Sequence, residues 1–462
     1  MNITFYGATR EVTGSCFLVQ TGRHRILVEC GLIQGSHEHE RHNRAPFPFS
    51  PRDIDAVVLT HAHLDHSGRL PLLVKQGFKG PIFTHRATAD LCAILLEDAA
   101  YLQEREAEWE RRKRKSHNQA DIEPLYDADD VRRAVKCFVP LEYRTPTEIL
   151  SGVGLTLLDA GHILGSSIVE LKLGDGERAR TVIFSGDLGH RDAPILCDPE
   201  TVDKADLVVM ESTYGDRLHR PWSETWAEIG EIIRSADSGR GNILIPAFAV
   251  GRTQELLYAF HQHFDDWKLG NWQIFLDSPL ANRATEVYAR HDEVYDVDAL
   301  RWQAKGAAPL ELPNLKVSRS TEDSMRINEI SSGAIIIAGS GMCTGGRIRY
   351  HLKYNVWREN AHVLIAGFQA AGTTGRALVD GARHIHLWGD EVEVKARIHT
   401  VGGLSAHADQ DGLVQWYGRI KGRPPVVLVH GEPQAMDALQ QRLQASFHAT
   451  VTEAAYMQTI PL

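Results

Sequence analysis

Residues 58–68 have the sequence Val-Leu-Thr-His-Ala-His-Leu-Asp-His-Ser-Gly, directly after an apolar run that we expect to be a buried strand. Neutral imidazole and carboxylate groups suit zinc. A tight turn at the strand end would point His61 and His63 one way and Asp65 and His66 another, which could serve two adjacent metal ions rather than one. The alternative is a histidine-rich surface loop, but neither helical nor strand periodicity explains such crowding.

Length and composition predict a globular protein of two domains. A chain of 462 residues exceeds what one hydrophobic core usually holds. The net charge of -10 creates no global positive field for nucleic acid, so phosphate binding must be local. The six cysteines form no C-x-x-C pair, and neither a signal-like N-terminus nor an apolar run of about 18 residues is found. We therefore expect a cytoplasmic protein without a membrane span.

The pattern of an apolar run followed by ligand-type residues recurs along the chain. Two predicted strands in the first half end in loops that contain His162 and Asp187, and two near the C-terminus end in loops that contain His407 and His430. A single histidine after a strand is usually only hydrogen-bonded. Because ligands gather in loops at strand ends, the repetition makes His162 and Asp187 the expected partners of the 61–66 cluster.

From residue 206 the predicted elements repeat in the order strand, glycine loop and helix. This order predicts a mostly parallel sheet flanked by helices in a second, inserted domain. The glycine loop at 339–346 lacks the third glycine of G-x-G-x-x-G, because Thr344 stands there. This loop is either a phosphate cradle built from backbone amides or only a tight turn. Ser340 and Gly341 in this loop, together with Ser405, are candidate contacts to phosphate or RNA.

Several motifs, spread over nearly the whole chain, resemble those of a known family. His61-x-His63-x-Asp65-His66, with His162 and Asp187 downstream, is similar to the motif of the metallo-β-lactamase superfamily. Four further strings resemble the β-CASP family, which includes the nuclease subunit of the eukaryotic mRNA 3′-end cleavage machinery and bacterial and archaeal ribonucleases. They are ESTYGDR at 211–217, GSGMCTGGR at 339–347, LSAHADQ at 404–410 and VLVHGE at 427–432.

This resemblance implies both a fold class and a domain order. The fold would be α/β, with a four-layer αββα metallo-β-lactamase domain and an inserted β-CASP domain made of a mostly parallel sheet flanked by helices. The expected ranges are 1–208 for the first part of the metallo-β-lactamase domain, 209–396 for the β-CASP domain and 397–462 for the C-terminal part.

The resemblance also implies a centre with two Zn²⁺ ions, although the ligand types do not exclude Mn²⁺. Asp187 and a hydroxide would bridge the ions. Glu29 stands where the family usually has aspartate, and it would support a zinc ligand from behind. One zinc would be held by His61, His63 and His162, and the other by Asp65, His66 and His430.

Asp65, Glu211 and His407 are the residues expected to carry catalysis. Asp65 is also a metal ligand. Departure of the alkoxide requires a proton, and we assign its donation to His407, held by Glu211. The alternative is that His407 is only a buried hydrogen-bonding residue.

The predicted function is hydrolysis of RNA phosphodiester bonds by a metal-bridging hydroxide, in RNA processing or degradation. His430 favours RNA, because DNA-acting relatives often have valine at that position. The alternatives are a DNA-acting β-CASP nuclease, a small-molecule metallo-hydrolase of the same superfamily and a catalytically silent RNA-binding scaffold. An inserted domain suits a polymer better than a small ester. The sequence leaves open endonuclease against exonuclease action, the preferred RNA and a homodimeric state.

Overall fold

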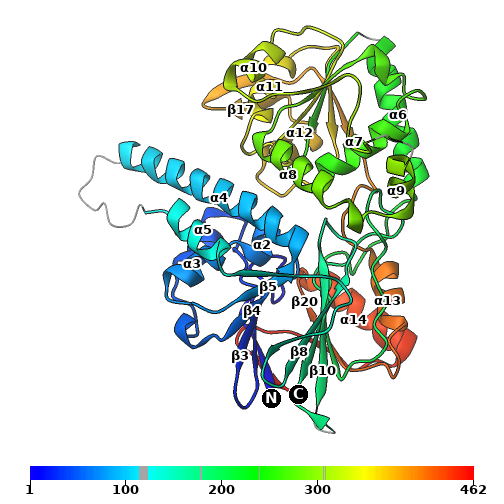
Figure 1. Cartoon of the computed structure of the whole chain (residues 1–462). Helices are drawn as coiled ribbons and strands as arrows, with labels where there is room; N and C mark the ends of the chain where they lie inside the picture. Colours follow the sequence, from blue (N-terminus) through cyan, green and yellow to red (C-terminus); the bar gives the residue numbers. More distant parts are fainter. Residues whose placement is uncertain (114–122, 177–178, 239, 305, 307) are drawn as a thin grey trace. The chain divides into compact units, whose positions relative to one another are not determined.

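In the computed structural model, the chain folds into two compact units (Figure 1). The structure describes residues 1–113, 123–176, 179–238, 240–304, 306 and 308–462. The first unit comprises Met1–Arg191, Asp198–Leu218 and His407–Leu462, and the second comprises Asp192–Cys197 and His219–Ala406.

The first unit contains two seven-stranded sheets. In spatial order, the first sheet is β22 (Thr459–Pro461), β1 (Asn2–Phe5), β2 (Phe17–Gln20), β3 (Arg25–Val28), β4 (Ala56–Val58), β5 (Ile82–His85) and β6 (Phe138–Leu141). The second sheet is β21 (Val451–Glu453), β20 (Val426–Val429), β11 (Leu207–Glu211), β10 (Arg180–Phe184), β9 (Ser167–Leu173), β8 (Val153–Asp159) and β7 (Thr147–Leu150).

The two sheets share one hydrophobic core. Ile3 and Val58 of the first sheet belong to the same buried cluster as Leu155 and Val209 of the second. Burial of these apolar side chains is the main force that holds the sheets face to face.

Helices cover the outer faces of the two sheets. On the second sheet, Trp416 and Leu439 pack with Ile183 and Val208 in a separate cluster. The prediction of a four-layer α/β domain is therefore confirmed, with sheets that mix parallel and antiparallel strands. The helices of this unit are α1 (His37–Glu40), α2 (Leu64–Ser67), α3 (Leu70–Lys75), α4 (Arg86–Lys113), α5 (Ala128–Val135), α13 (Gln410–Gly418) and α14 (Pro433–Phe447).

The second unit is built on a six-stranded sheet in which neighbouring strands pair in parallel. Its strand order is β14 (Leu315–Val317), β13 (Gln273–Leu276), β15 (Ala334–Ala338), β12 (Ile243–Pro246), β16 (His362–Ile365) and β19 (Arg397–Thr400), and a separate hairpin joins β17 (His384–Leu387) to β18 (Asp390–Glu393).

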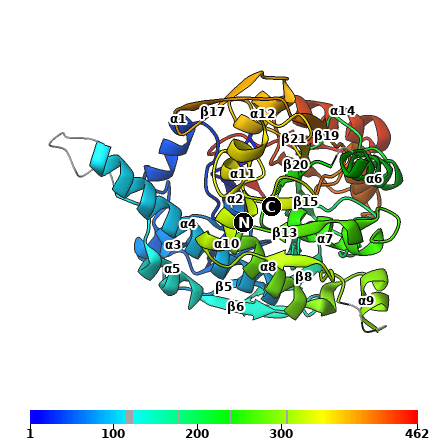
Figure 2. The ribbon, with the colours of Figure 1, turned by 90° about the horizontal axis from the view of Figure 1, so that it is seen from above.

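Helices flank this parallel sheet, as the alternating sequence pattern predicts. Ile327, Leu352 and Leu378, from three different helices, pack against one face of the sheet. The helices are α6 (Trp222–Ser238), α7 (Arg252–Gln262), α8 (Pro279–Arg290), α9 (Val297–Ala304), α10 (Thr321–Ile327), α11 (Ile348–Asn355) and α12 (Thr374–Val379). Figure 2 shows the three helices that carry these packed residues, labelled α10, α11 and α12.

The compact units divide the chain at positions that differ from the expected domain limits. The chain passes between units at 191/192, 197/198, 218/219 and 406/407, whereas the expected limits are 208/209 and 396/397. β11 pairs with β20 and therefore belongs to the first unit. β19 pairs with β16 and therefore belongs to the second unit. The functional domain ranges themselves remain a prediction.

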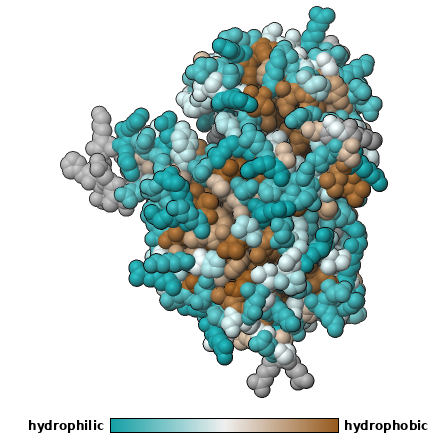
Figure 3. All heavy atoms as spheres, viewed as in Figure 1, coloured by the Kyte–Doolittle hydropathy of each residue, from teal (hydrophilic) through white to brown (hydrophobic). Residues whose placement is uncertain are grey.

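Hydrophilic residues occupy most of the face drawn in Figure 3, with separate hydrophobic patches between them. Within the described ranges, no helix has the length and apolar character that a membrane crossing requires.

Candidate metal centre

The 61–66 cluster follows the carboxyl end of β4. His61 and His63 lie in the turn that leads into α2, and Asp65 and His66 lie in the helix itself. Ser67 closes this turn by donating through Oγ to the carbonyl oxygens of Ala62 (2.9 Å) and His63 (3.0 Å). A second segment approaches so closely that a Cβ at position 31 would lie 1.6 Å from the carbonyl oxygen of Asp65. Only glycine fits at Gly31, and this close approach holds the turn in place.

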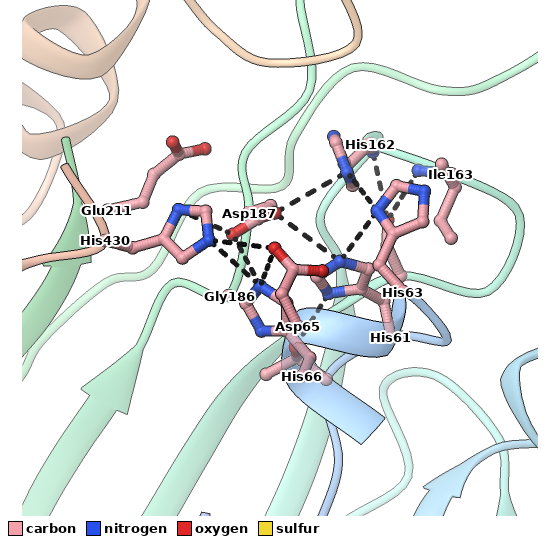
Figure 4. Close-up of polar contacts among 12 residues, drawn as sticks. His61, His63, Asp65, His66, His162, Ile163, Gly186, Asp187, Glu211 and His430 are labelled. Carbon is pink, nitrogen blue, oxygen red and sulfur yellow. Dashed lines mark hydrogen bonds and ion pairs between the residues drawn. The ribbon is translucent and has the colours of Figure 1, made fainter. Parts of the chain in front are cut away.

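The remaining candidate ligands come from the carboxyl ends of strands in the second sheet. His162 follows β8, Asp187 follows β10 and His430 follows β20, while Glu211 is the last residue of β11. β8 and β10 are both antiparallel to β9, and β10, β11 and β20 are parallel to one another. All four carboxyl ends therefore meet at one edge of the sheet, where the side chains converge (Figure 4).

A first group of donor atoms comes from His61, His63, His162 and Asp187, whose ligand atoms lie within 4.8 Å of one another. Nδ1 of His63 is 3.2 Å from Nε2 of His61 and 3.2 Å from Nε2 of His162. Oδ2 of Asp187 is 3.4 Å from Nε2 of His61 and 3.6 Å from Nε2 of His162. Three nitrogens and one carboxylate oxygen converge, which is a donor set that zinc prefers.

A second group of donor atoms comes from Asp65, His66 and His430. Nε2 of His430 lies 3.3 Å from Nε2 of His66 and 3.3 Å from Oδ2 of Asp65. His430 comes 364 positions after His66 and 365 positions after Asp65 in the chain. The second group is therefore complete only after β20 has joined the sheet.

Asp187 faces both groups with different oxygens. Its Oδ2 points to His61 and His162, whereas its Oδ1 lies 3.4 Å from Nε2 of His66 and 3.7 Å from Nδ1 of His430. Oδ1 is buried and has no hydrogen-bond partner among the residues that the structure describes. A buried carboxylate oxygen in this state is costly unless a cation compensates it, so the residues present fit bound metal.

The pKa shifts of the buried His66 and of Asp187 show that the site favours a positive charge. Burial, with the charge of His66 next, lowers the pKa of His61 well below its ordinary value, so His61 offers a neutral nitrogen. Burial opposes ionisation of Asp187, but His430 and His66 more than offset it and hold the pKa of Asp187 well below its ordinary value. Burial also opposes the charge of His66, yet Asp187 and Asp65 raise the pKa of His66 well above its ordinary value.

Glu29 supports the site from behind. Its Oε2 lies 3.1 Å from Nδ1 of His66, and its Oε1 accepts a 2.8 Å hydrogen bond from the backbone N–H of Thr60. Burial raises the pKa of Glu29, while its contact with His66 works in the opposite direction. The longer side chain of glutamate thus reaches the far nitrogen of a ligand histidine and can orient its ring.

Two threonines that the sequence did not single out orient other ligands. Oγ1 of Thr60 is 3.0 Å from Nδ1 of His61, and Oγ1 of Thr213 is 3.0 Å from Nδ1 of His430. Each contact fixes the ring nitrogen that points away from the metal group. Thr60 could have been found from the sequence, because it directly precedes His61. Thr213 could not, because it reaches His430 only through the pairing of β11 with β20.

His407 and Glu211 form a separate pair next to the metal groups. Nδ1 of His407 lies 3.2 Å from each carboxylate oxygen of Glu211 and 3.9 Å from Oδ2 of Asp187. Burial lowers the pKa of His407, but the charge of Glu211 outweighs it and the pKa is raised to about 9. The carboxylate of Glu211 thus favours the protonated form of the His407 imidazole.

The three candidate phosphate contacts all belong to the second unit. Ser340 and Gly341 lie in the loop after β15, and Ser405 lies after β19. Oγ of Ser340 accepts hydrogen bonds from the backbone N–H groups of Thr344 (3.1 Å) and Gly345 (3.0 Å), so this hydroxyl shapes its own loop. Contact of these residues with phosphate remains a prediction.

A histidine and aspartate cluster at the strand ends of an αββα sandwich defines a metallo-hydrolase of the metallo-β-lactamase type. Family models match in the expected order: the metallo-beta-lactamase superfamily over residues 9–235, the Beta-Casp domain over 253–378 and the Zn-dependent metallo-hydrolase RNA specificity domain over 391–453. The chain belongs to the β-CASP family of this superfamily, and the resemblance seen in the sequence is confirmed.

Named relatives match nearly the whole chain. A protein of Thermus thermophilus named as a ribonuclease is 40% identical over 443 residues, which cover 96% of each chain. The transcription termination factor FttA of Methanocaldococcus jannaschii is 30% identical, over 94% of this chain and 67% of that protein. A crystal structure of a protein of unknown function from Enterococcus faecalis V583 shares the fold, with a TM-score of 0.55, 12% identity and coverage of 100% and 99% of the two chains.

Proposed function

We propose that this protein is a two-zinc ribonuclease that hydrolyses phosphodiester bonds of RNA. The observation that carries the proposal is Asp187, whose two carboxylate oxygens face two separate sets of donor atoms. A bridging carboxylate between two donor groups suits a pair of metal ions. The ribonuclease name of the Thermus relative and the RNA specificity domain matched at residues 391–453 support RNA as the substrate.

The proposed ligand sets follow the two groups, with His61, His63 and His162 on one ion, Asp65, His66 and His430 on the other, and Asp187 shared. When bound, two zinc ions activate water near neutral pH and neutralise charge on a phosphodiester. The chain contributes the orientation of the ligands, through Glu29, Thr60 and Thr213. Mn²⁺ could occupy the same donors, so the metal identity is part of the test.

The leaving alkoxide needs a proton, and we assign its donation to His407. The ring is held by Glu211 and is 20% exposed, whereas Glu211 is 1% exposed. The imidazole can therefore meet a substrate while its carboxylate partner stays out of water. General acid catalysis by a positioned histidine typically contributes about 10²- to 10⁴-fold in rate.

The test is cleavage of end-labelled RNA by the purified protein, with and without a chelator, and with Zn²⁺ or Mn²⁺ restored. Internal fragments would indicate an endonuclease, and stepwise release of mononucleotides from one end would indicate an exonuclease. Comparison of 5′-triphosphate and 5′-monophosphate substrates shows whether cleavage depends on the 5′ end. We expect chelator-sensitive cleavage of RNA. If the metal-loaded protein leaves RNA intact but hydrolyses a thioester or a lactam, the small-molecule alternative holds. Binding of RNA without any cleavage would support the silent scaffold, and cleavage of DNA in preference to RNA would support the DNA-acting alternative.

A cytoplasmic location and a homodimeric state remain predictions. Cell fractionation tests the first, and light scattering on the purified protein tests the second.

A further inference from the structure

Two half-exposed phenylalanines lie at the carboxyl edge of the parallel sheet in the second unit. Phe248 follows β12 and is 47% exposed, and Phe368 follows β16 and is 59% exposed. β12 and β16 are neighbours in the sheet, so their loops emerge side by side. Ligands of parallel α/β sheets bind at this edge, so two exposed rings on adjacent loops there are candidates for ligand contact.

Gly341 lies between the ring of Phe248 and a hydrogen-bonded bridge to the backbone of Phe368. The ring of Phe248 lies against Gly341, where an added Cβ would come within 2.8 Å of the ring atom Cδ2. Gln369 donates through Nε2 to the carbonyl oxygen of Gly341 (2.9 Å) and to that of Phe368 (3.0 Å). Gln369 is only 6% exposed, so this bridge between the loops is protected from water.

The backbone that carries Phe248 is fixed as well. The carbonyl oxygen of Phe248 accepts hydrogen bonds from the backbone N–H (3.3 Å) and from Oγ1 (2.7 Å) of Thr253. The N–H of Ala247 donates to the carbonyl oxygen of Ala338 at the end of β15 (3.1 Å). A ring on a fixed backbone loses little conformational freedom when a ligand packs on it, which favours binding.

The exposed rings at this edge suit the base of a nucleotide. The cation that ends the neighbouring glycine loop, Arg347, is bound to the buried carboxylate of Asp277 and to Oγ of Ser318. Its charge is therefore already compensated. A phenylalanine ring offers a flat apolar face, on which any nucleobase can stack without regard to sequence.

We propose that Phe248 and Phe368 form a base-stacking subsite for single-stranded RNA. The inference rests on the proposed ribonuclease function and adds a place where unpaired bases are held. It implies that the subsite tolerates any base, rejects paired RNA and contributes binding that depends little on salt, because no ion is released on stacking.

The test is the affinity of the full-length, metal-loaded protein for a fluorescent, phosphorothioate-substituted single-stranded RNA, measured by anisotropy. Phe248→Ala and Phe368→Ala should each weaken binding about 10-fold, the scale expected for loss of one stacked base. Phe248→Leu should lose as much, because it keeps apolar bulk without a π face, whereas Phe248→Trp should bind as well as the wild type. Tyr354→Ala is the matched control, since Tyr354 is an equally exposed aromatic at the far end of α11.

A second arm replaces bases in the same RNA with abasic residues. Wild-type protein should bind this RNA more weakly, and the phenylalanine variants should no longer differ from wild type. Thermal melting of each variant checks that it is folded. Unchanged affinity of both alanine variants, in a protein that binds and cleaves RNA, would overturn the stacking subsite and leave the ribonuclease proposal standing. A wild-type protein that neither binds nor cleaves RNA would overturn both.

Discussion

Nδ1 of His407 lies 3.2 Å from each carboxylate oxygen of Glu211, although the two residues are 196 positions apart in the chain. Oε1 of Glu211 also accepts a 2.6 Å hydrogen bond from the backbone N–H of Leu188, next to Asp187. The backbone N–H of Ala408, next to His407, donates in turn to the carbonyl oxygen of Leu188 (2.7 Å). Glu211 thus positions the imidazole and the loop of the central metal-site carboxylate at the same time.

Glu211→Gln should lower kcat on RNA by about 10²-fold or more, because the neutral amide no longer holds the imidazole as a proton donor. KM and metal content should stay close to wild type. His407→Ala should lower kcat to a similar level, and the double variant should be no slower than either single variant, since the two residues act as a unit. Glu170→Gln, which changes a carboxylate on β9, is the control. Full activity of His407→Ala would contradict the assignment of His407 as the general acid.

His430→Ala should remove one metal ion while leaving the other, because His430 contacts Asp65 and His66 but lies outside the first donor group. Metal content by mass spectrometry should fall from about two ions to about one per chain, with loss of RNA cleavage. The exposed His448, at the end of α14, provides the control variant His448→Ala. Two retained ions in a folded His430→Ala protein would contradict the proposed ligand set.

Glu29→Gln should weaken metal binding about 10- to 100-fold, the usual effect of losing a carboxylate behind a ligand histidine. The amide can keep a hydrogen bond to His66, but it lacks the charge that stabilises the ring against bound metal. Competition with a fluorescent chelator measures the effect. Glu29→Asp restores the residue that the family usually carries. If the carboxylate charge matters more than the length of the side chain, the metal affinity of this variant should be nearer to that of the wild type. Equal affinities for wild type and Glu29→Gln would exclude this role.

Asp277→Asn should destabilise the second unit by about 3 to 5 kcal/mol, because it breaks a buried, hydrogen-bonded ion pair. The fully buried Asp277 carboxylate accepts from Nε2 of His351 (2.7 Å), Oγ of Ser324 (2.6 Å) and Arg347 (2.5 Å). Urea unfolding measures the loss, and Asp298→Asn on the exposed face of α9 is the control. Since the first unit holds the metal groups, its metal content should be unchanged. A loss below about 1 kcal/mol would show that the network contributes little to stability.

A histidine pair makes the stability of the second unit depend on pH. Nδ1 of His362 lies 2.9 Å from Nε2 of His399, and burial, then the charges of His399 and Arg397, lower the pKa of His362 from 6.5 to about 4. Between these pH values the unfolded chain binds more protons than the folded one, so the free energy of unfolding falls as the pH is lowered.

His362→Gln removes this titrating group, and the decline between pH 6.5 and 4 should become shallower. Urea unfolding at a series of pH values gives the slope, with His384→Gln on the exposed side of β17 as the control. An identical slope for wild type and His362→Gln would refute this source of acid sensitivity.

Much of the metal centre could be predicted from the sequence because its first four residues are local. A strand followed by a tight turn brings His61, His63, Asp65 and His66 near one another within six residues. The α/β class and the parallel sheet of the second unit are local as well, since they follow from the periodicity of apolar residues and from glycine loops. The order of the motifs was sufficient to identify the family.

The sequence alone therefore determined the fold class, the family and the residue types of the site. Only the tertiary structure decided which atoms meet: that Asp187 turns its two oxygens to different donor groups, that Thr213 orients His430, and that β19 belongs to the second unit. It also placed Phe248 and Phe368 on neighbouring loops, joined through Gly341. The physical reason is that these contacts depend on strand pairing between segments far apart in the chain, which local periodicity does not encode.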